Sequence, residues 1–235
     1  MENSARPGWI VILNGAPRSG KSSIVRAIQD SSDVVWMNLG VDVFVREVTP
    51  ERFRPGIGLR PGGERPDLEP YLPPMFAALY DSIAAHSRQG LNVVVDVGHH
   101  DSYSRPLGML SRCAERVRGL PVLFVGVRCP IEVIMQRRND GQDGREYLRG
   151  SEVDPPLPVR CWQEAVHVPG IYDLEVDTSV ASPEECAERI LKRIQEGLSP
   201  DAFWRAGEAL SSKNLPDNED ARPCRTECGR GLRMN

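Results

Sequence analysis

The sequence predicts an α/β fold in which a parallel five-stranded sheet carries helices on both faces. Short apolar runs alternate along the chain with segments of helical spacing, which is the order that produces a parallel sheet. The runs at 93–95 and 122–125 are apolar without alternation, as expected of strands that are covered on both faces. A glycine-rich loop joins the first apolar run to the first helical segment, as in folds that bind phosphate groups.

Each predicted element rests on a local pattern. Five apolar runs are predicted to be strands: Ile10–Leu13, Val34–Asn38, Leu91–Val97, Val122–Val127 and Tyr172–Val176. Five segments are predicted to be helices: Lys21–Gln29, Pro73–Ser87, Leu107–Arg118, Pro130–Asn139 and Pro183–Glu196. Met75, Leu79 and Ile83 form an apolar face in the second helix, which Gly90 ends. The fifth helix starts after Ser182, a favoured N-cap, with proline and two acids in its first turn.

The pattern predicts one folded domain over residues 1–197. Residues 198–235 are expected to form a largely disordered polar tail, with a short helix at 202–210. Inside the domain, residues 49–74 are rich in proline and glycine, which predicts a long irregular loop with a functional role.

Composition excludes several classes of function. The chain has 235 residues, of which 40% are hydrophobic, and this is enough for one sizeable core. A net charge of −4 argues against a nucleic-acid or membrane-surface binder, because such proteins usually carry a basic excess. No apolar run has the length of a membrane span, and residues 1–8 lack the apolar core of a signal peptide. We therefore expect a cytoplasmic protein with a small-molecule partner, in a monomer or a homo-oligomer.

The glycine-rich loop fits the phosphate-binding P-loop pattern G-x-x-x-x-G-K-[ST]. A chance glycine turn is the alternative, but the strand before the loop and the helix after it favour a nucleotide site. Loop amides and the helix N-terminus would hold phosphates, Lys21 would reach the β- and γ-phosphates, and the Ser22 hydroxyl would bind Mg²⁺. The predicted nucleotide-binding residues are Gly15, Ala16, Pro17, Arg18, Ser19, Gly20, Lys21, Ser22 and Ser23.

Two carboxylates lie at or just past the carboxyl ends of predicted strands and should be near the P-loop, because these ends of parallel strands face the ligand crevice. Asp42 could accept the proton of an attacking hydroxyl, or could only cap the helix that follows it. Asp96 could help Ser22 to hold Mg²⁺, or could be a polar strand end. His99 and His100 lack metal-ligand spacing, so we expect them to line the substrate cleft or to face water.

A cluster of arginines follows the fourth predicted strand and its helix. Such clusters form lids that neutralise phosphate charge, and the glycines at 141 and 144 would let the segment move. An ordinary solvated helix end is the alternative for any one of them. The cluster contains Arg128, Arg137, Arg138, Arg145 and Arg149.

Several short motifs resemble, in their order, the chloramphenicol phosphotransferase-like family of small P-loop kinases. The resemblance runs from about Trp9 to Ile194. The motifs that carry it are Ile12–Gly15 before the P-loop, Gly40-Val41-Asp42, Val93–Asp96, Val125–Cys129 and Tyr172–Thr178.

The resemblance implies a nucleotide-kinase-like fold, ATP with Mg²⁺, and transfer of the γ-phosphoryl group to a hydroxyl of a small molecule. It matches Asp42 to the family's catalytic base, and Lys21 and Ser22 to its P-loop groups. It places Arg137 and Arg145 among the lid arginines, and His167 where the family also has a histidine of undefined role. The segment at 150–162, with three prolines, looks like an insertion, and it should touch the acceptor together with 49–74 and the histidine pair.

An ATP-dependent O-phosphotransferase acting on an antibiotic-like acceptor is therefore the leading hypothesis. A kinase of a metabolite, such as a sugar acid or a nucleotide, is the second. A nucleotide-binding regulatory or toxin-type module is the third, and the acidic charge and lack of a recognition domain weigh against it.

Overall fold

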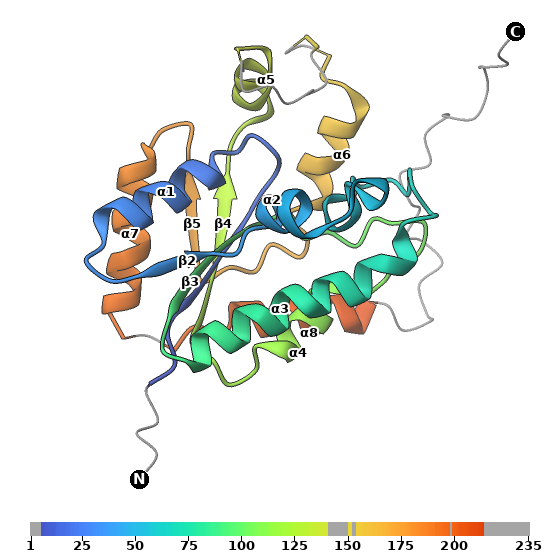
Figure 1. The fold of residues 1–235 in the computed structure, drawn as a ribbon. Helices are drawn as coiled ribbons and strands as arrows, with labels where there is room; N and C mark the ends of the chain where they lie inside the picture. Colours follow the sequence, from blue (N-terminus) through green and yellow to red (C-terminus); the bar gives the residue numbers. More distant parts are fainter. Residues whose placement is uncertain (1–5, 141–149, 152–153, 198, 214–235) are drawn as a thin grey trace, which may run out of the picture.

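The structure, a computed structural model, describes residues 6–140, 150–151, 154–197 and 199–213. Five parallel strands form one sheet in the order β2-β3-β1-β4-β5, as drawn in Figure 1. The strands are β1 (Ile10–Asn14), β2 (Trp36–Asn38), β3 (Asn92–Val97), β4 (Val122–Arg128) and β5 (Leu174–Asp177). The α/β fold with a five-stranded parallel sheet is thus confirmed.

The central strand β1 fixes the sheet. All five of its residues are buried, and it pairs with β3 on one side and β4 on the other. Ile12 lies opposite Val95 and Phe124, so three apolar runs lie side by side at the centre of the sheet. Because all strands are parallel, their carboxyl ends lie at one edge of the sheet.

Helices cover both faces of the sheet, as Figure 1 shows. The helices α1 (Lys21–Ser31) and α7 (Pro183–Gln195) pack together on one face, where Ile24, Ile28 and Ile190 are fully buried. The expected N-cap Ser182 forms a capping box at the start of α7, since Ser182 Oγ accepts from Glu185 N at 3.1 Å and Glu185 Oε2 accepts from Ser182 N at 2.7 Å. The opposite face carries α3 (Leu72–Arg88), α4 (Met109–Arg116) and α8 (Ala202–Lys213).

The proline- and glycine-rich segment at 49–74 is not one irregular loop, because it contains 3₁₀ turns at Glu51–Phe53, Gly56–Gly58 and Glu69–Tyr71. Two short helical turns precede it, α2 (Val41–Val43) and a π-helical turn (Phe44–Val48). Ile57, Leu59 and Leu68 are buried in the core, so the segment is held against the carboxyl end of the sheet.

Two further helices stand above the sheet's carboxyl edge in Figure 1, α5 (Ile131–Asp140) and α6 (Leu157–Ala165). Helix α6 lies in the segment that the sequence suggested to be an insertion. Its prolines do not break it, because Pro156 is its N-cap and Pro158 lies in its first turn, where no backbone N–H is needed. No helix in the described part of the chain is long and apolar enough to cross a bilayer.

The domain boundary expected after residue 197 is wrong, because α8 belongs to the folded core. Ala202, Phe203 and Ala206 are buried, and Phe203 contacts the ring of Phe124 on β4. Asp173 holds the start of α8, since its Oδ1 accepts from the amides of residues 201 and 202 at 3.1 Å each. The rest of the expected tail, 214–235, lies outside the described residues.

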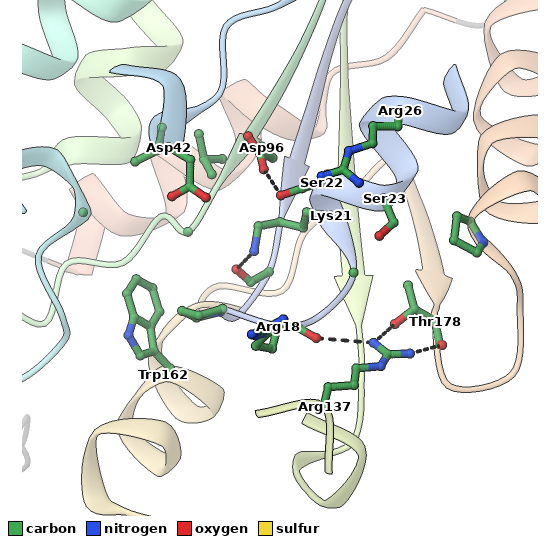
Figure 2. Close-up of a pocket in the computed structure, with 18 of the residues that line it drawn as sticks. Arg18, Lys21, Ser22, Ser23, Arg26, Asp42, Asp96, Arg137, Trp162 and Thr178 are labelled. Atoms are coloured by element: carbon green, nitrogen blue, oxygen red, sulfur yellow. Dashed lines mark hydrogen bonds between the residues drawn. The ribbon is translucent and has the colours of Figure 1, made fainter. Parts of the chain in front are cut away.

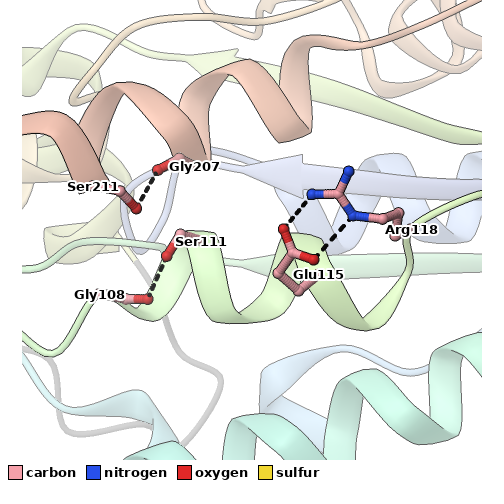
Figure 3. A network of polar contacts seen from close by, with 6 residues as sticks. All are labelled: Gly108, Ser111, Glu115, Arg118, Gly207 and Ser211. Atoms are coloured by element: carbon pink, nitrogen blue, oxygen red, sulfur yellow. Dashed lines mark hydrogen bonds and ion pairs between the residues drawn. The ribbon is translucent and has the colours of Figure 1, made fainter.

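Helix α8 packs closely on α4, as Figure 3 shows. The approach is possible because Gly207 has no side chain: a Cβ there would come within 3.0 Å of Ser111 Cα. Hydroxyl groups near the contact bond to their own helices, Ser111 to Gly108 O and Ser211 to Gly207 O.

We expect Phe203→Ala to lower the free energy of unfolding by about 3–5 kcal/mol, because it leaves a cavity in the core between α8 and β4. Urea unfolding followed by circular dichroism measures the change. Arg205→Ala on the exposed side of the same helix is the control, and it should cost less than about 0.5 kcal/mol. A Phe203→Ala variant as stable as this control would show that α8 is not part of the core.

Candidate active site

The P-loop follows β1 and leads into α1, as the motif requires. Its backbone is held in unusual conformations, with φ of 71° at Arg18 and 93° at Gly20. Gly15 is pressed against β4, since a Cβ there would lie 2.6 Å from Val127 O. A hydrogen bond joins the loop to the turn after β5, because Thr178 Oγ1 donates to Ser19 O at 2.8 Å.

Lys21 points back along the loop. Its Nζ donates to Gly15 O at 2.7 Å and to Ala16 O at 2.8 Å. Burial lowers the pKa of Lys21 from 10.5 to about 8, although the carboxylates of Asp96 and Asp42 act to raise it. Burial strips water from the Lys21 ammonium and so disfavours its charged form, and a phosphate group that binds beside it would restore that form.

Ser22 and Asp96 meet as expected from their positions. The Ser22 hydroxyl donates to Asp96 Oδ2 at 2.7 Å, and Asp96 is only 8% exposed. Gly40 lies against the other oxygen, where a Cβ would come within 1.7 Å of Asp96 Oδ1. One carboxylate therefore joins the first turn of α1 to the start of α2.

Asp42 lies in the first turn of α2 and faces the same cavity. It is not the N-cap, which is Gly40, so the capping alternative does not describe this residue. Its side chain is 49% exposed, and its Oδ2 lies 3.5 Å from Arg46 Nη2.

These residues line one cavity of about 730 Å³, shown in Figure 2. Lys21 and Ser22 lie between its two ends. One end is polar and is formed by the P-loop, α1, α5 and the turn after β5: Pro17, Arg18, Ser23, Arg26, Arg137, Asp140, Thr178, Ala181 and Pro183. The other end is mostly apolar: Val41, Asp42, Ile57, Gly58, Phe76, Val97, Gly98 and Trp162.

Arg137 joins three parts of the polar end, as Figure 2 shows. Its Nη1 donates to Thr178 Oγ1 at 3.0 Å and to Arg18 O at 3.3 Å, and its Nη2 donates to Thr178 O at 2.6 Å. These donors go to protein acceptors, so within this geometry Arg137 supports the P-loop and adds positive charge to the cavity.

The expected arginine lid is only partly present in the described residues. Arg128 pairs with Glu175 and lies over the Tyr172 ring, because it leaves the sheet beside β5 and away from the cavity. Arg138 is buried and does not line the cavity. Arg145 and Arg149 lie outside the described residues.

The expectation that His99 and His100 line the cleft or face water is wrong. They are 3% and 4% exposed and pack behind the cavity, because the chain turns inward after β3. His99 Nε2 lies 2.6 Å from Tyr80 Oη, and burial lowers the pKa of His99 to about 3. His167 Nδ1 lies 2.8 Å from Tyr172 Oη, which accepts from Asn14 Nδ2 just before the P-loop.

The sequence predicted that residues 49–74 and 150–162 touch the acceptor, but it singled out none of the apolar side chains that line this end of the cavity. Trp162 escaped notice because its helix was taken for an insertion, although Val159, Trp162 and Val166 are spaced as one buried helix face. Phe76 was not singled out because a phenylalanine in the predicted helix at 73–87 suggests only a core residue. Ile57 was hidden in a segment without periodic pattern, so no local signal could have placed it.

The model of the chloramphenicol phosphotransferase-like protein family matches residues 8–195. The chain belongs to this family. It is 28% identical over 214 residues to O-phosphotransferases, named as such without proof of activity, from two strains of Mycobacterium tuberculosis. The match covers 84% of this chain and 87% of each relative. The resemblance found in the sequence and the expected enzyme class, a phosphotransferase, are confirmed.

Solved kinases share the fold of this family member. A sugar kinase from Janibacter aligns with a TM-score of 0.55 at 19% identity, over 80% of this chain and 95% of the kinase. The APS kinase of Mycobacterium tuberculosis gives a TM-score of 0.55 at 14% identity, over 80% of this chain and 98% of its own. Shikimate kinase from Acinetobacter baumannii gives 0.54 at 12% identity, over 83% and 96%. The P-loop kinase fold predicted from the sequence is confirmed.

We expect Gly40→Ala to lower the free energy of unfolding by about 1–3 kcal/mol, because the new methyl group would displace Asp96 from Ser22. Backbone strain is not the cause, since φ of −66° at Gly40 suits alanine. Urea unfolding measures the change. Gly58→Ala is the control, because its Cβ would meet only ordinary contacts, at 3.7 Å and beyond. Equal stability of the two variants would contradict the close packing at Asp96.

Proposed function

We propose that the protein is an ATP-dependent O-phosphotransferase that moves the γ-phosphoryl group to a hydroxyl of an antibiotic-like small molecule. The observation that carries the proposal is the position of Asp42. It lies at the apolar end of the cavity, and Lys21 of the P-loop lies between it and the polar end. The kinase fold and the family are consistent with this reaction. A cytoplasmic enzyme would have ready access to ATP.

The polar end of the cavity would hold the nucleotide. The loop amides at 15–20 and the N-terminus of α1 would bind the phosphate oxygens. Lys21 would exchange its carbonyl partners for the β- and γ-phosphates, and its charge would stabilise the negative charge of the transferring group. Arg137 would keep Thr178 and the P-loop in place.

The oxygens of Ser22 and Asp96 fit Mg²⁺, which prefers hard oxygen ligands. The Ser22 hydroxyl and the Asp96 carboxylate are already hydrogen-bonded to each other at 2.7 Å. Gly40 lies so close to Asp96 that no side chain would fit at that position. When bound, Mg²⁺ would neutralise phosphate charge and orient the γ-phosphate. The residues that would hold it are Ser22 directly and Asp96 directly or through water.

Asp42 would act as the general base. Its half-exposed carboxylate can accept the proton of the acceptor hydroxyl as that oxygen attacks the γ-phosphorus. The γ-phosphoryl bond to ADP breaks as the bond to the acceptor oxygen forms, and the proton remains on Asp42 until release. Such a base distinguishes a transferase from an ATPase, which needs a group that positions water.

The apolar end favours an antibiotic-like acceptor over the alternatives. Among the described residues of that end, none carries a positive charge, whereas a sugar acid or a nucleotide would require one for its anionic group. Phe76, Trp162 and Ile57 would instead contact the apolar body of the acceptor. The name of the family refers to an antibiotic acceptor as well.

We expect Asp42→Asn to lower kcat about 10²–10⁴-fold with little change in ATP affinity, because the base is lost while the phosphate site is kept. A panel of hydroxylated antibiotics and metabolites, with mass detection of the added phosphate, first identifies an acceptor. Steady-state kinetics and calorimetric ATP titration then measure the two quantities.

Asp81→Asn is the control for Asp42→Asn, because Asp81 is an exposed carboxylate on α3 that pairs with Arg116. It should keep full activity. An unchanged kcat in Asp42→Asn refutes the base, and lost ATP binding would assign Asp42 to Mg²⁺ instead. Rapid ADP release without any acceptor would favour an ATPase.

We also expect ATP affinity to fall as the pH rises from about 7 to about 9.5, by up to tenfold per pH unit above the Lys21 pKa. Lys21 loses its proton near pH 8 in the free protein, and the triphosphate binds the charged form. Binding near pH 8 should therefore take up a proton, which calorimetry in buffers of different ionisation enthalpy detects. Lys21→Ala should bind weakly at every pH and show no such dependence; an equal slope in this variant would assign the titration to another group.

A further inference from the structure

The buried ring of His100 lies behind the apolar end of the cavity. It lies three residues beyond the end of β3 and is 4% exposed. Its Nε2 lies 2.9 Å from Leu59 O. Its ring meets the Trp162 ring edge-on, with centroids 5.1 Å apart and an interplanar angle of 89°, and the Tyr103 ring at 4.4 Å.

These contacts join two cavity walls that are distant in the sequence. Leu59 follows Ile57 and Gly58, which line the apolar end, and its amide closes the 3₁₀ turn on Gly56 O at 3.0 Å. Trp162 lies on α6, about 100 residues further along the chain. His100 therefore touches a backbone acceptor behind one wall and an aromatic ring of the other.

The short stretch before His100 fits the same arrangement. Gly98 lies against Trp162, since a Cβ there would come within 2.7 Å of the indole ring. The chain after β3 thus approaches α6 closely, and it places His100 between Trp162 and Leu59 O.

The protonation state of His100 keeps its hydrogen bond to Leu59 O the same near neutral pH. Burial lowers its pKa to about 4, although its bond to Leu59 O and the carboxylates of Asp101 and Glu69 act to raise it. The ring is therefore neutral near pH 7 and carries one N–H. Because a carbonyl can only accept, that N–H is on Nε2 and donates to Leu59 O.

We propose that His100 is a positioning residue that fixes both walls of the acceptor end of the cavity. The proposal rests on the proposed function for the identity of that end. His100 is not among the residues that line the cavity, so it would act on the acceptor through Ile57, Gly58 and Trp162.

Two substitutions separate the hydrogen bond from the ring. His100→Phe keeps a flat ring against Trp162 and removes the donor, which leaves Leu59 O buried without its partner. His100→Gln keeps an N–H at nearly the place of Nε2 and removes the ring. A positioning role through the hydrogen bond predicts a large effect of Phe on the segment at 56–60 and rescue by Gln.

Hydrogen exchange measured by mass spectrometry tests the positioning without any acceptor. We expect roughly tenfold faster exchange at 56–60 in His100→Phe, near wild-type exchange there in His100→Gln, and faster exchange at 159–166 in His100→Gln. Exchange in β1 and α1 should not change. Unchanged exchange in both segments of both folded variants overturns the proposal; if His100→Phe does not fold, His100→Asn, whose amide is too short to reach Leu59 O, takes its place.

Kinetics with the acceptor identified above test the consequence. We expect His100→Phe to raise the acceptor KM about tenfold while the ATP KM stays within twofold. Leu110→Ala is the control, because it removes a buried side chain of α4 away from the cavity and should lower stability with no change in either KM. Equal acceptor KM values in His100→Phe and wild type refute the effect on the acceptor. If wild type phosphorylates no acceptor, the proposed function is refuted, and the hydrogen-exchange result alone decides whether His100 positions the two walls.

Discussion

The hydrogen bond between Ser22 and Asp96 is the contact on which the rest of the site depends. It joins the helix after β1 to the end of β3, two neighbouring strands in which Leu13 lies opposite Asp96. The other oxygen of Asp96 lies against Gly40, so the same carboxylate sets the place of α2 and of Asp42. The distance between the phosphate loop and the expected base is thus fixed by one buried group at a strand end, and not by flexible loops.

The sequence predicted this constellation because a general rule of parallel sheets applies to it. Lys21, Ser22 and Asp42 lie on the segments that follow β1 and β2, Asp96 lies near the end of β3, and the carboxyl ends of parallel strands meet at one edge. No comparable rule places Trp162 or Phe203. Their helices contain prolines or follow a polar stretch, and only the tertiary contacts show that Trp162 reaches the cavity and that Phe203 fills the core beside Phe124.

Local composition also misled where burial decides the outcome. Val34 and Val35 read as strand residues, yet they are 57% and 62% exposed and β2 begins only at Trp36. The reason is that β2 is an edge strand and pairs with β3 over three residues, from Trp36 opposite Asn92 to Asn38 opposite Val94. His99 and His100 misled in the opposite way, because adjacent polar residues after a strand suggested solvent while the chain carries both rings into the core.

The two ends of the cavity differ in a way that would serve phosphoryl transfer. An acceptor that fills the apolar end would exclude water from the space next to Lys21, and low polarity would strengthen the attraction between its ammonium and a phosphate. Burial already weakens the lysine's hold on its proton, as its lowered pKa shows. Under the proposed function, the acceptor wall and the charge of Lys21 are therefore coupled: a change that lets water into the apolar end would raise the pKa of Lys21 and weaken its electrostatic effect together. The positions of Ile57 and Trp162, which His100 joins, would then influence the phosphate site as well as the choice of acceptor.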